Sequence, residues 1–309
     1  MIHDLKLKLK MDPFRRFRLH LKQALGTVGL VTTLLPSLAC AQAVGADLNV
    51  SPPRVIFNAG SRADTVLVYN RGTQPATYNI ELVDRLMTPD GRLQSLAEVG
   101  TTPDEAAARV RLKSAHDLIS FSPRRVTLPP GEGQTIRLRI LRPADLAPGE
   151  YRSHLTITAV PDQDQGLTAE QAAGKGPATG IGVKLTALFS VSVPLFVRQG
   201  SPDLNVTISP VRYRGPDKPG QAASLVVDVQ RSGSMTAYGD IVVETMDGGA
   251  AGKALSQFGG IGVYPEIDHR SVDMQLSRPL AHGEKVRISF KDRDLKPGQS
   301  LASAVFTAP

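Results

Sequence analysis

The stretch VKLTALFSVSVPLFVR at residues 183–198 carries the strongest structural signal in this sequence. Apolar side chains occupy every second position along it, namely Leu185, Ala187, Phe189, Val191, Val193, Leu195 and Val197. Because successive side chains of a β-strand point to opposite faces, this alternation places all seven on one face of one strand. At ~3.3 Å per residue the strand would span roughly 45 Å, whereas a typical strand spans ~17–20 Å. The sequence therefore predicts an unusually long β-strand.

Two interpretations of this strand stay open. It is either a central strand whose apolar face lies in its own core, or an exposed edge strand that lends its apolar side chains to another protein. An exposed apolar edge normally promotes aggregation. The second interpretation therefore requires that the edge completes the sheet of a partner.

The chain before this stretch is also predicted to form strands, separated by tight turns such as Pro129-Pro130-Gly131. The candidate strands are residues 50–57, 63–70, 76–86, 121–128, 134–141 and 151–160. Polar loops are expected at 88–117, with one helical turn near 104–110, and at 161–182. Together with residues 183–198 this gives seven strands over ~150 residues, which is typical of an immunoglobulin-like β-sandwich.

A second set of strands follows the long strand. The candidates are residues 204–213, 225–231, 240–246, 267–276, 285–291 and 301–307, and their spacing again predicts a sandwich. A Gly-Ser-Pro turn at Gly200 separates the two sets. The chain of 309 residues is long enough for two domains. We therefore expect an all-β protein with one domain at 44–199 and a second at 200–309.

The first 43 residues have the pattern of a targeting segment. Seven Lys and Arg precede an apolar run at 24–35, and the small residues Ala41-Gln42-Ala43 follow it. The run of ~12 residues is shorter than the ~20 needed to span a bilayer. This favours a cleaved signal peptide over a membrane anchor. A lipoprotein that keeps Cys40 as its acylated first residue is the further alternative, although Ser37 stands where an aliphatic residue is expected.

Export changes how the charge and the cysteine are interpreted. The net charge is +7, but the residues after 43 contain 29 basic and 27 acidic side chains. A nucleic-acid partner therefore loses its electrostatic support. Cleavage after Ala43 would also remove the single cysteine, so that no disulfide could stabilise the exported chain.

No pattern typical of catalysis is found. The Gly-rich stretch 248–253 loosely resembles a phosphate loop, but Asp247 stands where its first glycine would be, and we interpret it as a turn. His116, His154, His269 and His282 are scattered without metal-ligand spacing. We expect no enzyme, no cofactor, no metal and no small-molecule substrate.

Five segments occur in an order and spacing that resemble the PapD-like periplasmic pilus chaperones of the chaperone–usher pathway. They are SPPRVIF at 51–57, VYN at 68–70, FSPRRVTLPPGEGQTIRL at 121–138, GEYR at 149–152 and SVPLFV at 192–197. The last is most similar to the archaic branch. The resemblance covers roughly residues 47–200, and the second domain only by general pattern.

The resemblance implies two immunoglobulin-like sandwiches at an angle, with a cleft between them. It also implies a periplasmic chaperone that binds pilus or fimbrial subunits by donor-strand complementation, a form of β-augmentation, and delivers them to an outer-membrane usher. The donor strand would then carry Leu185, Ala187, Phe189, Val191 and Val193.

Basic residues that bind the subunit's C-terminal carboxylate are implied as well. Arg54 matches the family's arginine in the first strand, but the family's lysine on the donor strand is replaced here by Pro194. Because the strand at 151–160 should run antiparallel to the donor strand, Arg152 and Arg198 are expected near one another. Arg54, Arg152 and Arg198 are therefore the predicted carboxylate anchors, since arginine binds carboxylates through two hydrogen bonds.

Two other functions compete with this hypothesis. A structural surface or matrix protein built from two sandwiches would be anchored in the outer membrane or lie outside the cell. A periplasmic hydrolase would need a catalytic triad, and the nearest candidates, His116, Asp117 and Ser120, resemble no nucleophile elbow.

Overall fold

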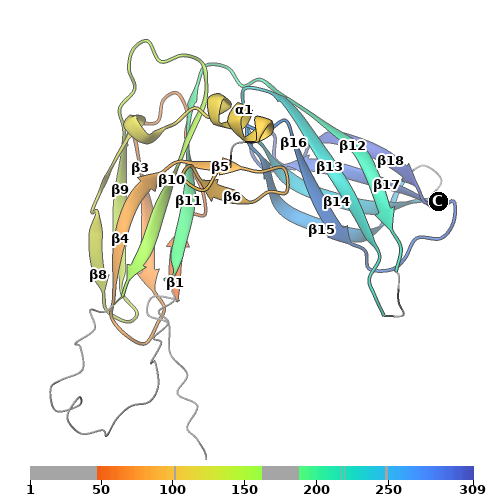
Figure 1. Cartoon of the computed structure of the whole chain (residues 1–309), viewed down its shortest axis with the longest axis horizontal. Helices are drawn as coiled ribbons and strands as arrows, with labels where there is room; N and C mark the ends of the chain where they lie inside the picture. The colour runs from red at the N-terminus through yellow and green to blue at the C-terminus, as the bar shows by residue number, and fades with distance from the viewer. Residues whose placement is uncertain (1–46, 101, 162–187, 217, 219, 248–249) are drawn as a thin grey trace, which may run out of the picture. The chain divides into compact units, whose positions relative to one another are not determined.

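The computed structural model describes residues 47–309 except 101, 162–187, 217, 219 and 248–249. β-strands dominate these residues, and one α-helix and one short 3-10 helix accompany them (Figure 1). The predicted signal peptide with Cys40, and the donor positions Leu185 and Ala187, lie outside the described residues.

The strands between residues 48 and 199 form two sheets. One sheet has the order β1-β3-β9-β7, with β1 at Leu48–Ser51, β3 at Ala63–Asn70, β9 at Gly133–Ile140 and β7 at Ile119–Ser122. The other has the order β2-β11-β10-β4-β8, with β2 at Val55–Phe57, β11 at Ser190–Gln199, β10 at Gly149–Val160, β4 at Ala76–Val83 and β8 at Arg125–Leu128. We call this pair of sheets the first sandwich.

The core of the first sandwich follows from alternation along its strands. On β9, Ile136, Leu138 and Ile140 are buried, whereas Arg137 and Arg139 are exposed. The buried side chains of both sheets join in one apolar cluster that includes Leu155 of β10. Burial of this cluster holds the two sheets together.

The strands between residues 204 and 307 form the second sandwich. Its sheets have the orders β12-β13-β16 and β15-β14-β17-β18. The strands are β12 at Leu204–Arg214, β13 at Ser224–Gly233, β14 at Ala237–Asp247, β15 at Ala250–Val263, β16 at His269–Gln275, β17 at Lys285–Asp292 and β18 at Ser300–Thr307. The prediction of an all-β chain with two immunoglobulin-like sandwiches is confirmed. Strands β1–β11 share no sheet with β12–β18, and we propose the domain boundary between β11 and β12.

Strand β15 was not predicted from the sequence. The turn predicted at 248–253 is wrong from Ala250 onward, where this strand begins. Its glycines lower the intrinsic tendency to form a strand. Pairing with β14 compensates, and the register shifts three times along the pair, as bulges do.

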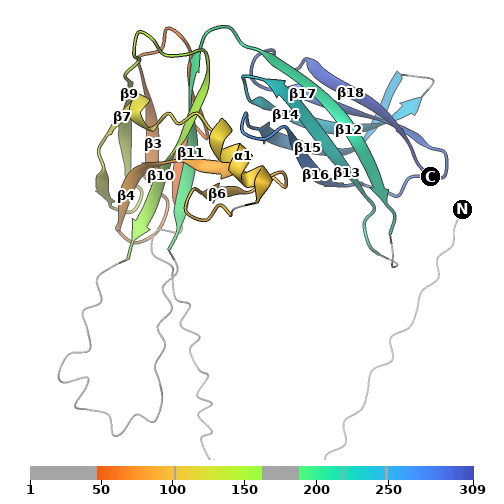
Figure 2. The ribbon, with the colours of Figure 1, turned by 45° about the horizontal axis from the view of Figure 1, so that its top comes forward.

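Residues 84–118 form an addition to the first sandwich that we call the insertion. It contains the hairpin β5 (Arg85–Met87) and β6 (Leu93–Ser95), then α1 (Pro103–Arg111) and the 3-10 helix His116–Leu118 (Figure 2). Leu86, Val99 and Ala108 give the insertion a small core of its own. The predicted loop with one helical turn is therefore corrected to a hairpin and a helix of nine residues.

Candidate functional site

Strand β11 is paired unequally on its two sides. Antiparallel pairing with β10 covers its whole length, from Ser190 to Gln199. On the other side, β2 pairs with β11 in parallel only from Leu195 to Val197. In the described part of the chain, β11 therefore has an unpaired side from Ser190 to Pro194, which we call the open edge.

The side of β11 to which each residue's backbone N–H and C=O point determines which of these groups are available at the open edge. The amide of Ala159 in β10 donates to the carbonyl oxygen of Phe189 at 2.9 Å. Because backbone groups of alternate residues point to alternate sides of a strand, those of Ser190 and Ser192 point to the open edge. Pro194 follows in the same phase, but it has no N–H. The open edge thus offers two N–H donors and ends at a residue without one.

The predicted donor side chains show graded burial along β11. Phe189 is 40% exposed, Val191 is half-buried and Val193 is 2% exposed within the core of the first sandwich. The interpretation of an own-core strand therefore holds for Val193 and beyond. The exposed apolar side chains, Leu188 and Phe189, lie at the N-terminal end of the described part of the segment.

Phe196 points to the opposite face of β11 and joins a different core. It is 1% exposed, belongs to the apolar cluster of the second sandwich, and contacts the ring of Tyr264 edge to face at 5.8 Å between centroids. One strand thus contributes buried side chains to both sandwiches.

Arg54 and Arg198, two of the predicted carboxylate anchors, meet at the carboxylate of Asp294. Nη1 of Arg198 donates to Oδ1 at 3.0 Å, and its Nη2 also contacts Oδ2. Nη2 of Arg54 donates to the same Oδ2 at 3.0 Å. Arg198 Nε further donates to Glu150 at 2.9 Å, and the guanidinium of Arg54 lies 4.0 Å from the ring centroid of Tyr238.

Arg152, the third predicted anchor, is paired with a different carboxylate. Its Nη1 and Nη2 donate to the two carboxylate oxygens of Glu266 at 2.9 and 2.6 Å, and both side chains are almost fully buried. The amide of Met87 in the insertion also donates to Glu266 at 3.0 Å. The guanidinium stacks on Tyr264, 3.9 Å from the ring centroid.

Electrostatics favours the charged form of these groups. Burial disfavours the charge on Arg198, but Asp294 and Glu150 outweigh it and raise its pKa above the usual value. Burial likewise acts to raise the pKa of Asp294, yet Arg198 and Arg54 hold that pKa below its usual range. The pairs are therefore ionised at neutral pH.

The expected antiparallel arrangement of β10 and β11 is confirmed, with Glu150 directly opposite Arg198. That Arg152 and Arg198 bind the subunit's carboxylate stays a prediction; within this chain they contact different carboxylates, Glu266 and Asp294. Sequence reasoning missed the carboxylates of Glu266 and Asp294. Their distance in sequence from the arginines, 114 and 96 residues, leaves no local signal.

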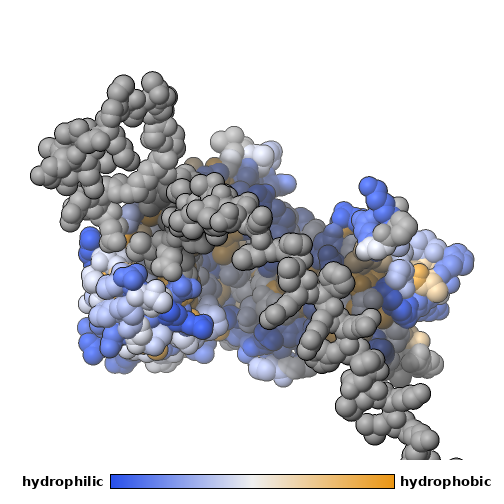
Figure 3. All heavy atoms as spheres, turned by 90° about the horizontal axis from the view of Figure 1, so that it is seen from below, coloured by the Kyte–Doolittle hydropathy of each residue, from blue (hydrophilic) through white to orange (hydrophobic). Residues whose placement is uncertain are grey.

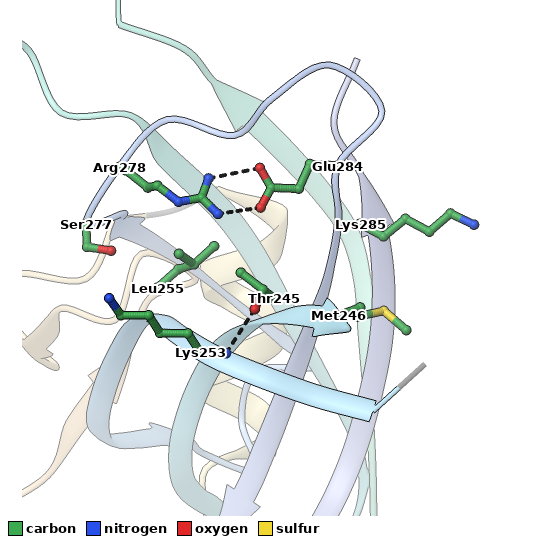
Figure 4. Close-up of a pocket in the computed structure, with 8 residues that line it drawn as sticks. All are labelled: Thr245, Met246, Lys253, Leu255, Ser277, Arg278, Glu284 and Lys285. Atoms are coloured by element: carbon green, nitrogen blue, oxygen red, sulfur yellow. Dashed lines mark hydrogen bonds and ion pairs between the residues drawn. The ribbon is translucent and has the colours of Figure 1, made fainter. Parts of the chain in front are cut away.

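A cavity of about 760 Å³ lies elsewhere in the second sandwich. Thr245, Met246, Lys253, Leu255, Ser277, Arg278, Glu284 and Lys285 line it. In Figure 4 the bidentate pair of Arg278 and Glu284 spans one side, and the amide of Lys253 donates to Thr245 on the other. No predicted site residue lines this cavity.

On the face seen in Figure 3, hydrophobic residues form small separate patches among hydrophilic ones. No group of three or more His, Cys, Asp or Glu within these residues is placed to hold a metal ion. Among the residues that the structure describes, no helix is long and apolar enough to cross a membrane.

No family model and no curated protein matches this chain. Among solved structures it is similar to the YadV chaperone, with 17% identity, coverage of 84% of this chain and 99% of that one, and a TM-score of 0.40. It is also similar to the Pseudomonas aeruginosa CupB2 chaperone, with 16% identity, coverage of 84% of this chain and 100% of that one, and a TM-score of 0.39. A third similar structure is the CsuC–CsuE chaperone–tip adhesion subunit complex from archaic chaperone-usher Csu pili of Acinetobacter baumannii. The identity is 14%, the match covers 84% of this chain and 97% of that one, and the TM-score is 0.40.

Proposed function

We propose that this protein is a non-enzymatic chaperone that binds pilus or fimbrial subunits by adding strand β11 to the incomplete sheet of the subunit. The observation that carries the proposal is the open edge of β11, unpaired from Ser190 to Pro194 in the described chain. The exposed Phe189 beside it supplies an apolar side chain for a partner's core. The ordered motifs that resemble pilus chaperones give the class of partner.

The pairing follows from backbone chemistry. An incoming strand would exchange hydrogen bonds with Ser190 and Ser192, as in other cases of β-augmentation. Phe189 and Val191, on the same strand face, would enter the subunit's groove. The added strand has to stop where β2 takes over the edge, at Leu195.

The finer parts of the proposal extend beyond the described residues. We propose that Leu185 and Ala187 continue the donor face, that the signal peptide directs the chain to the periplasm, and that the bound subunit passes to an outer-membrane usher. Of the three predicted anchors, Arg54, Arg152 and Arg198, we propose Arg54 as the one that meets the subunit's carboxylate. Arg152 and Arg198 each bind a carboxylate of this chain through two nitrogens, whereas Arg54 makes a single contact with Asp294.

Substitutions at Ser192 test strand pairing directly. Ser192→Pro removes an N–H from the open edge and leaves the pairing with β10 unbroken, whereas Ser192→Ala keeps the N–H. Both variants lose the hydroxyl contact with Thr156, which makes them a matched pair. An unpaired carbonyl left in the partner costs about 1–3 kcal/mol, so we expect the proline variant to bind the subunit about 5-fold to 150-fold more weakly and to retain correspondingly less of it.

The measurement is co-purification of a co-expressed pilus subunit from the periplasm, with thermal unfolding as the check on folding. The alanine variant should retain the subunit as wild type does. Equal retention by the proline variant would show that the open edge is not used. No retained subunit with wild type would leave the structural surface or matrix protein as the better hypothesis.

A further inference from the structure

Asp294 fills the position that the predicted anchors would offer to a foreign carboxylate. Its two oxygens contact Arg198 twice and Arg54 once. It lies in the turn between β17 and β18, where its own amide donates to Asp292 at 2.9 Å. The second sandwich thus supplies a carboxylate to two arginines of the first.

The two arginines bind Asp294 with unequal strength. Arg198 is bidentate on Asp294, also donates to Glu150, and has a side chain that is only 8% exposed. Arg54 contributes one donor, and its side chain is 15% exposed. Its Nε is buried and has no hydrogen-bond partner among the described residues. Its Nη1 also makes no hydrogen bond among these residues, but it is not one of the buried atoms. Charge-assisted bidentate pairs are the stronger kind, so Arg54 is the partner that can leave Asp294.

Arg54 also lies where an added strand would end. It directly precedes β2, and the first residue of β2, Val55, pairs with Leu195. A strand laid along the open edge parallel to β11 therefore runs toward Arg54 and brings its carboxyl end there. A terminal carboxylate at this point meets a guanidinium that Asp294 already occupies.

We propose that Asp294 is a built-in competitor for the terminal carboxylate of the bound subunit. The subunit takes Arg54 from Asp294, and Asp294 stays on Arg198. The inference rests on the proposed strand pairing and adds a regulation of the same site. Competition lowers the affinity for the carboxylate and so eases release of the subunit.

Asp294→Asn tests the competition, because asparagine keeps the shape of the side chain and removes its charge. The probe is a short synthetic peptide of alternating valine and threonine with a free C-terminal carboxylate, compared with its C-terminally amidated copy. Calorimetric titration of the whole protein should show that the variant binds the free acid about tenfold more tightly than wild type does, the difference between an ionic and a neutral competitor. Affinity for the amide should not change.

Two further variants make the test decisive. In the Arg54→Ala background Asp294→Asn should have no effect on the free acid, as a double-mutant cycle requires. Glu284→Gln removes a carboxylate from the exposed pair with Arg278 in the same sandwich and should leave both affinities unchanged. Thermal unfolding of each variant confirms that it is folded.

The inference is overturned if Asp294→Asn binds the free acid no better than wild type, or if it improves the amide equally. Either result would make Asp294 only a clamp between the sandwiches. Failure of the proposed function is a separate outcome, because it appears as absence of a retained subunit in the Ser192 experiment.

Discussion

His154 on β10 is fully buried, and both of its ring nitrogens lack a hydrogen-bond partner among the described residues. Burial is the main cause that lowers its pKa, to about 2, and the nearby charges of Arg152 and Arg85 act in the same direction. The imidazole is therefore neutral in the folded protein. At mildly acidic pH the imidazole is protonated only in the unfolded chain.

We expect this histidine to make the protein acid-sensitive. The pKa is about 2 when folded and 6.5 in the unfolded reference. The unfolded state therefore binds a proton below about pH 6.5 that the folded state does not bind. The free energy of unfolding is unaffected by His154 above that pH and falls below it by about 1.4 kcal/mol per pH unit. Urea unfolding at about pH 7.5 and pH 5 should show a loss of about 2 kcal/mol that His154→Leu does not show. Equal losses in both proteins would exclude His154 as the cause.

The sequence could point to Arg54, Arg152 and Arg198 more easily than to the groups that these arginines contact within the chain. The family motif picks out Arg54, and antiparallel pairing places Arg152 and Arg198 on neighbouring strands. The carboxylates of Glu266 and Asp294 lie in loops of the second sandwich. Only the tertiary structure brings loops so distant in sequence to the arginines, and the periodicity of the sequence does not predict such contacts.

Strand β11 changes its environment along its length, and this defines a test at the scale of the element. Phe189→Glu places a charge on an exposed side chain at the donor end, so the variant should fold but retain at least about tenfold less subunit. Phe258→Glu on β15 is the matched control, because that phenylalanine is 48% exposed, against 40% for Phe189. Co-purification and thermal unfolding of both variants are the measurements.

The control is expected to retain the subunit. If both variants retain it, the donor face does not extend to Phe189. If Phe189→Glu unfolds the protein, that side chain belongs to its own core.

The elements differ in how far the sequence could predict them. Strand β9 was found because strict alternation matches a half-buried strand. Strand β15 was missed because Gly252, Gly259, Gly260 and Gly262 hide any period, and pairing with β14 overrides their low propensity. Helix α1 was reduced to one turn, although Thr102 and Glu105 form a capping box around Pro103 at the first position. That signature could have given its start.

At the scale of the whole molecule, buried contacts join the two sandwiches. Arg152 pairs with Glu266, and Arg198 pairs with Asp294. Met87 of the insertion and Phe196 of β11 belong to the apolar cluster of the second sandwich. Unfolding of one sandwich therefore exposes charges and apolar surface of the other.

Glu266→Gln should destabilise the whole protein. Removal of one partner of a buried ion pair leaves an uncompensated charge, here on Arg152, and costs about 3–5 kcal/mol. Asp273→Asn in the exposed, single-contact pair with Arg214 should change stability little. Denaturant unfolding of both variants is the measurement, and equal effects would contradict a coupling through Glu266.

The insertion has an apolar core separate from those of the two sandwiches. Mutations confined to that core leave the packing of both sandwiches intact, so we expect the insertion to tolerate changes in sequence and length better than the sheets do. Met87, Ala115 and Leu118 are exceptions, because Met87 belongs to the core of the second sandwich and the other two belong to the core of the first. Evolution can therefore vary this region as a nearly independent module, provided that Met87, Ala115 and Leu118 are kept.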